Sequence, residues 1–155
     1  MKRATLAGVR ITQGPGDWQI VQRRLDNSSD VPLAGTWKED DDRQGIVEVR
    51  VVDETFQQPV ADHLDWHDAD TAPNNTWRHL LTDVPVGGPY RIETRLRVKG
   101  DNWRLAGDHI HHFCVGDLWI AAGDDNALGF GLGMAEDPPE LGVHRSEEHT
   151  SELQS

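Results

Sequence analysis

Residues 90–98 alternate strictly between two kinds of side chain. Tyr90, Ile92, Thr94, Leu96 and Val98 are interleaved with Arg91, Glu93, Arg95 and Arg97. This period of two predicts a β-strand with one face on a core and the other in water. Residues 46–52 repeat the pattern, with valines at alternate positions. Before residue 90, two glycines and a proline predict a turn, because glycine permits positive φ and proline cannot donate to a ladder.

Weaker strand patterns lie near residues 7–11, 18–23, 77–84 and 108–115, and segments rich in Gly, Pro, Asn and Asp separate them. No segment has a convincing helical period. Several short strands joined by turns are typical of a sandwich of two sheets. The sequence therefore predicts a mainly β fold, with an antiparallel β-sandwich of jelly-roll or Ig-like type over residues 1–115.

The pattern changes at Gly116. Residues 118–122 read LWIAA, a continuous apolar run that is typical of a strand buried on both faces in a parallel α/β sheet. A polar turn bounded by glycines follows, over residues 123–129. We expect residues 116–144 to hold the first strand and turn of an incomplete, flavodoxin-like α/β domain, since a doubly wound sheet needs several such units.

Residues 145–155 read RSEEHTSELQS and share neither the apolar periodicity nor the aromatic content of the preceding chain. The segment is identical to a one-frame translation of a common sequencing adapter. Foreign segments of this kind are excluded from fold reasoning. We therefore expect residues 145–155 to be a non-native tail that interrupts the second domain.

Charge and apolar content exclude several classes of partner. The chain has 27 Asp and Glu against 15 Lys and Arg, a net charge of -12. Nucleic acids and anionic membranes are captured by clustered Lys and Arg, so neither is expected as a partner. No signal-peptide or membrane-spanning pattern is present, which by default predicts a soluble, cytoplasmic protein. The single cysteine, Cys114, excludes an intramolecular disulfide and the cysteine pairs of structural zinc sites.

Residues 115–129, VGDLWIAAGDDNALG, resemble the opening block of the sialate O-acetylesterase-like carbohydrate esterases, which are SGNH (GDSL-like) hydrolases. In that family the first strand runs into Gly-Gln-Ser-Asn, and a β-sandwich often precedes the catalytic domain. The resemblance implies a parent enzyme that hydrolyses acetyl esters on sugars through a serine. It further implies an acylated carbohydrate as the partner, with no metal and no organic cofactor.

The nucleophile loop departs from the family pattern. Gly123 and Asn126 match, but Asp124 and Asp125 replace the Gln-Ser pair. Asp125 at the nucleophile position brings a carboxylate where the family has a hydroxyl, and its charge would repel the oxyanion that forms in acyl transfer. The family's oxyanion blocks and its Asp-His pair would lie downstream of residue 144. This fragment is therefore expected to be inactive.

Two patterns could be taken for metal sites. Residues 40–45, DDDRQG, fit the first half of a calcium loop, but Val51 occupies the twelfth position, where the loop needs a glutamate. An acidic hairpin tip is the better interpretation. His109 and His111 project from one face of a predicted strand, and two ligands are too few to define a site. No metal site is predicted.

Tryptophans support a second hypothesis. We expect Trp37, Trp77 and Trp119 to lie in the core, and we expect Trp66 and Trp103, near predicted loops, to be the possible platforms for a sugar ring. His63 and His67, which flank Trp66, are expected to be solvated loop residues. The alternative function is thus a stand-alone carbohydrate-binding or interaction module of the β-sandwich class.

Overall fold

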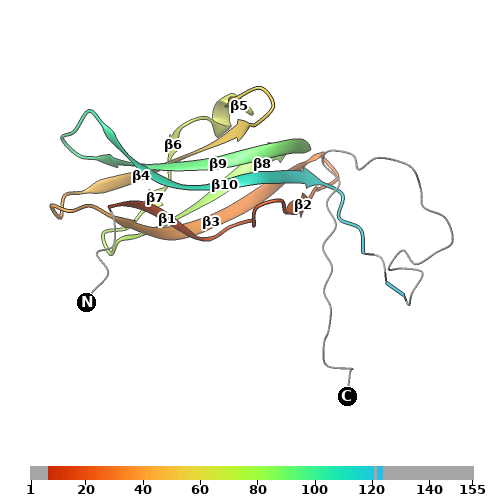
Figure 1. Cartoon of the computed structure of the whole chain (residues 1–155), viewed down its shortest axis with the longest axis horizontal. Coiled ribbons are helices and arrows are strands. Elements are labelled where there is room, and N and C mark those ends of the chain that lie inside the picture. Colours follow the sequence, from red (N-terminus) through yellow and green to blue (C-terminus); the bar gives the residue numbers. More distant parts are fainter. Residues whose placement is uncertain (1–6, 121, 124–155) are drawn as a thin grey trace, which may run out of the picture. The chain divides into compact units, whose positions relative to one another are not determined.

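The computed structural model describes residues 7–120 and 122–123. The chain divides into two compact units, Met1–Leu118 and Trp119–Ser155, and every described strand lies in the first (Figure 1). The strands are β1 (Gly8–Gln13), β2 (Ile20–Gln22), β3 (Ser28–Lys38), β4 (Gly45–Asp53), β5 (Gln58–Pro59), β6 (His67–Asp68), β7 (Asp70–Thr71), β8 (Thr76–Pro85), β9 (Gly87–Val98) and β10 (Arg104–Gly116). A 3-10 turn, η1 (Asp62–Leu64), is the one helical element of the described residues. The predicted mainly β class is confirmed.

The strands form one curled sheet in the order β5-β4-β9-β10-β1-β3-β8-β7, with β2 beside β10 and β6 beside β4. Most ladders are antiparallel, but β10 pairs in parallel with both β1 and β2. The sheet is therefore mixed, and the expectation of purely antiparallel pairing is wrong at β10. This strand comes last in the sequence of strands and yet lies in the middle of the sheet (Figure 1).

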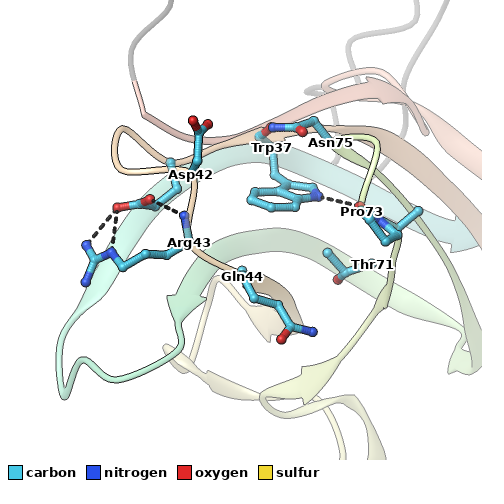
Figure 2. Close-up of a pocket in the computed structure, with 10 residues that line it drawn as sticks. Trp37, Asp42, Arg43, Gln44, Thr71, Pro73 and Asn75 are labelled. Atoms are coloured by element: carbon cyan, nitrogen blue, oxygen red, sulfur yellow. Dashed lines mark hydrogen bonds and ion pairs between the residues drawn. The ribbon is translucent and has the colours of Figure 1, made fainter.

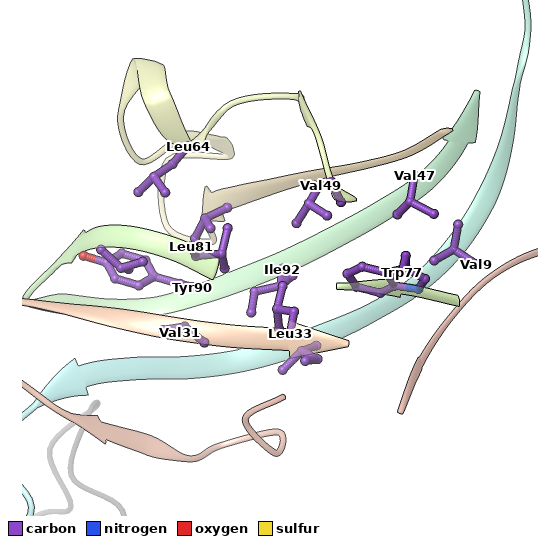
Figure 3. Close-up of a cluster of buried hydrophobic side chains, with 14 of the residues drawn as sticks. Val9, Val31, Leu33, Val47, Val49, Leu64, Trp77, Leu81, Tyr90 and Ile92 are labelled. Atoms are coloured by element: carbon purple, nitrogen blue, oxygen red, sulfur yellow. The ribbon is translucent and has the colours of Figure 1, made fainter. Parts of the chain in front are cut away.

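One hydrophobic core lies inside the curl. Inward side chains of β1, β3 and β8 pack against those of β4, β9 and β10, as Figure 3 shows for Leu33, Trp77 and Val49. The predicted core face of β9 is confirmed, because Ile92 and Leu96 are fully buried. Its opposite face is not simply in water, since Glu93 is only 7% exposed.

Strand β3 was not predicted, because Pro32 and Gly35 interrupt its pattern. Residues 31, 33, 35 and 37 nevertheless point inward in strict alternation. Strand β1 pairs with β3 only from Ala34 onward, so Pro32 lies beyond the end of β1, where a missing N–H leaves no gap in that ladder. Gly35 lies where β1 approaches so closely that a Cβ would be 1.8 Å from the carbonyl oxygen of Arg10.

The predicted buried strand at 118–122 is wrong for the residues that can be described. Leu118, Trp119 and Ile120 belong to no strand, and Trp119, expected in the core, is 86% exposed. The N–H of Leu118 donates to the side chain of Gln22 rather than to a neighbouring strand. Asp124, Asp125, Asn126 and the tail at 145–155 lie outside the described residues, so the second domain stays a prediction. Within the described part, no helix has the length and apolar character needed to cross a bilayer.

Candidate functional site

A cavity of about 390 Å³ lies between the loop that joins β3 to β4 and the loop that joins β7 to β8 (Figure 2). Residues from both loops and from the adjoining ends of β3, β4 and β7 line it: Trp37, Glu39, Asp42, Arg43, Gln44, Gly45, Thr71, Ala72, Pro73 and Asn75. A second cavity of about 310 Å³ shares four of these residues and continues toward Arg10 and Thr36. Its lining includes Thr36 and Lys38, which lie on the outward face of β3, whereas the Trp37 side chain points inward.

One wall is the acidic loop at residues 39–44. Sequence analysis assigned residues 40–45 to a hairpin tip, and that connection is wrong. Strand β3 pairs with β1 and β8, whereas β4 pairs with β5, β6 and β9. The loop therefore crosses from one half of the curled sheet to the other, which places its polar side chains beside residues 71–75.

Glu39 fixes the shape of this loop. Its carboxylate is buried and accepts hydrogen bonds from the backbone N–H groups of Asp41 at 2.8 Å and Arg43 at 3.0 Å. The Arg43 guanidinium donates to the same carboxylate at 2.7 Å and reaches Asp101 at 2.9 Å on its other side. The hydrogen bond from Arg43 holds the pKa of Glu39 below its usual value. The hydrogen-bonded carboxylate of Glu39 thus fixes the conformation of this wall.

The opposite wall is built on Trp37. Its indole N–H donates to the carbonyl of Ala72 at 3.2 Å, and its backbone N–H donates to the carbonyl of Asn75 at 2.9 Å. The Asn75 side chain returns a hydrogen bond to the carbonyl of Trp37 at 3.1 Å. Trp37 is 8% exposed, as expected of a core residue, but its ring also borders the cavity. The sequence does not predict this second role, because residues 72–75 are remote from Trp37 in the chain.

Two polar side chains on the cavity rim have no hydrogen-bond partner among the described residues. They are the carboxylate of Asp42 and the amide of Gln44, two exposed residues of the loop beside the indole (Figure 2). Pro73 and the Trp37 ring supply apolar surface across from them. Such a mixture can bind a neutral molecule that has hydroxyl groups on its edge and C–H groups on its face.

The two predicted sugar platforms lie elsewhere. Trp66 is partly buried, and the guanidinium carbons of Arg50 and Arg95 lie 4.6 Å and 3.8 Å from its ring centre. Trp103 is 53% exposed, just before β10. Neither lines the cavity, and their binding of sugar stays a prediction. The nucleophile-loop residues Gly123, Asp124, Asp125 and Asn126 come together in no described arrangement, since only Gly123 is described.

The histidine run folds around a carboxylate. Glu54 accepts hydrogen bonds from the backbone N–H of His112 at 3.1 Å and from its Nδ1, and it lies 3.8 Å from Nδ1 of His111. The His112 ring stacks on Trp18, with 4.2 Å between ring centres. His109 and His111 lie on one face of β10 as predicted, with 5.7 Å between their ring centres, and the strand is bulged just after them, where His112 has φ 58.

His67 was expected in solvent, but it is partly buried and lies against His79 on β8, with 2.7 Å between their Nε2 atoms. Burial, followed by the neighbouring His67, lowers the pKa of His79. Among residues 7–120 and 122–123, no group of three or more His, Cys, Asp or Glu side chains is arranged to hold a metal ion.

Comparison of the chain with protein-family models gives no match, and a search of curated proteins finds none either.

Proposed function

We propose that residues 7–118 form a non-catalytic module of the β-sandwich class that binds carbohydrate in the cavity beside Trp37. In this interpretation, β1-β3-β8-β7 is one layer and β4-β9-β10 is the other. The observation that carries the proposal is the pairing of an indole wall with the unpartnered polar groups of Asp42 and Gln44. A sugar ring offers a C–H face to the indole and hydroxyl groups to the carboxylate and amide. The cavity volume lies within the usual range of small-molecule sites, about 300–1,000 Å³.

Saturation-transfer NMR on the full chain tests this proposal, with the methyl glycosides of galactose, N-acetylglucosamine and N-acetylneuraminic acid as probes. Gln44→Ala and Asp42→Gly should each weaken binding about tenfold, since each removes a hydrogen-bonding group from the cavity. Glycine suits the positive φ of residue 42. Gln58→Ala, an exposed amide on β5, is the matched control. Binding that is unchanged in both cavity variants would contradict the assignment. So would the absence of binding by all three probes.

We further propose that this module accompanies a catalytic domain of the sialate O-acetylesterase type, acting on an acylated carbohydrate. The support is the order of the chain, in which the β-rich body directly precedes the block at 115–129 that resembles that family. Because Asp125 stands at the nucleophile position, the chain itself should not hydrolyse 4-nitrophenyl acetate. Turnover that Asp125→Asn abolishes would refute the inactivity.

A direct test of this second proposal is to sequence the source DNA across the codons for residues 120–155. We expect a Gln-Ser pair at 124 and 125, followed by an open frame that continues in place of RSEEHTSELQS. A confirmed Asp124-Asp125 pair followed by the same eleven-residue tail would contradict it.

A further inference from the structure

The outer face of β4, β9 and β10 concentrates positive charge in an otherwise acidic chain. We call it the arginine face, and it is formed by Arg50, Arg91, Arg95, Arg97 and Arg104 around two buried glutamates, Glu48 and Glu93. Cross-strand register brings these side chains together, since Glu48 lies opposite Arg95 and Arg50 lies opposite Glu93. The whole chain has a net charge of -12, so a local excess of guanidinium groups needs a physical explanation.

The two glutamates contact all five arginines through the Nε atoms of their guanidinium groups. Glu48 makes ion pairs with Nε of Arg95 at 2.5 Å and with Nε of Arg97 and Arg104 at 3.2 Å. Glu93 likewise pairs with Nε of Arg50 at 2.6 Å and of Arg91 at 2.7 Å. Burial raises the pKa of Glu93, but the hydrogen bonds from both arginines outweigh it and leave that pKa below its usual value. Both carboxylates are therefore already paired with arginines of β4, β9 and β10.

The other side of Arg50 and Arg95 is left without an acceptor. Both donate through Nε, and no described residue accepts a hydrogen bond from their terminal nitrogens. Both guanidinium groups also lie against the ring of Trp66, and the register of β4 and β9 makes the two arginines diagonal neighbours on this face. Nε of the neighbouring Arg97 is buried and makes no hydrogen bond, although it lies 3.2 Å from a Glu48 oxygen. The donors on this face thus exceed the acceptors that the chain supplies.

We propose that the arginine face binds one oxyanion group, the carboxylate or sulfate of an acidic saccharide, through the terminal nitrogens of Arg50 and Arg95. Paired guanidinium nitrogens match the two oxygens of such a group, and the buried glutamates orient them before the ligand arrives. A single small anion suits this face better than a polyanion, because the acidic remainder of the chain repels a long charged ligand. The choice of a saccharide rests on the proposed function, whereas the anion site does not.

Isothermal titration of the full chain tests the proposal with four probes: methyl galacturonide, galactose 6-sulfate, sodium sulfate and neutral methyl galactoside. At least one acidic sugar should bind ten times more tightly than the neutral one, with weaker binding at higher salt. Arg95→Lys should reduce that affinity about tenfold, since lysine keeps the charge near Glu48 but loses the paired nitrogens. Arg50→Gln should act in the same direction.

The controls separate this site from its surroundings and from the cavity. Arg78→Gln removes an arginine on β8 that is 82% exposed and paired with Asp70, so it should leave acidic-sugar binding unchanged. Gln44→Ala should also leave it unchanged, so the anion site can hold even if the cavity proposal fails. Equal affinity for acidic and neutral sugars, or an equal loss with Arg78→Gln, would overturn the inference. So would binding of sodium sulfate that Arg95→Lys does not weaken.

Discussion

Single residues decide how closely the strands approach, and Gly35 is the clearest case. Any Cβ at this position would meet the Arg10 carbonyl oxygen at 1.8 Å and Nε1 of Trp77 at 2.7 Å. The Trp77 indole N–H donates to that same carbonyl at 3.1 Å. A hydrogen in place of a side chain therefore allows β1 to approach β3 closely while the buried indole keeps its partner.

Gly35→Ala should destabilise the fold by about 3 kcal/mol or more, because the backbone of β1 must move and the Trp77 hydrogen bond is broken. Urea unfolding followed by tryptophan fluorescence would measure the loss. Gly16→Ala is the control, since its nearest new contact is a side-chain oxygen of Gln19 at 3.7 Å. Similar stabilities for the two variants would rule out close strand approach as the reason for glycine at 35.

At the scale of elements, sequence patterns predicted strands where burial differs sharply between the two faces. Six of the seven segments predicted as strands contain one, because Val, Ile and Leu alternate with polar residues there, whereas the continuous apolar run at 118–122 forms no strand over its described residues. Strand β3 was not predicted because it contains a proline. The proline is tolerated because the neighbouring strand has ended at that point, and this pairing joins segments that are remote in sequence. The cavity was not predicted for the same reason, since its lining residues Gln44 and Pro73 belong to different loops that are remote in sequence. The burial of Glu48 and Glu93 depends on arginines from three strands.

The arginine face should contribute to stability through its buried carboxylates. Glu48→Gln should lower the free energy of unfolding by about 1–3 kcal/mol, because three guanidinium groups lose their shared anion while solvent still screens them. The loss should shrink at 1 M salt. Asp68→Asn, which removes an exposed partner of Arg97, should cost less than about 1 kcal/mol. Urea titrations at two salt concentrations compare the variants, and equal losses would argue against a special role for Glu48.

The molecule as a whole should lose stability in two steps as the pH falls. Burial, the largest cause for each, lowers the pKa of His79 and His109 below the usual histidine value of 6.5. The unfolded chain then binds more protons than the folded one, so the free energy of unfolding falls as the pH drops below about 6.5. Hydrogen bonds from arginines outweigh burial to lower the pKa of Glu39 and Glu93, and the stability that these groups supply above pH 4.5 is lost only below it.

His79→Gln should make the first step smaller, because glutamine does not titrate, and should leave in place the part that His109 causes and the second step. Urea midpoints measured between pH 7.5 and 3.5 would reveal both steps. Parallel profiles for the variant and the parent chain would show that His79 does not cause the first.

The central position of β10 has a consequence for how the protein is made. Residues 104–116 are the last described strand to leave a ribosome, yet they join β9 to β1 and β2. Until these residues emerge, the nascent chain contains two half-sheets with unpaired inner edges and an unfilled core. Unpaired strand edges and exposed core residues bind chaperones and promote aggregation. Closure of this sheet therefore waits for β10, which joins both halves at once.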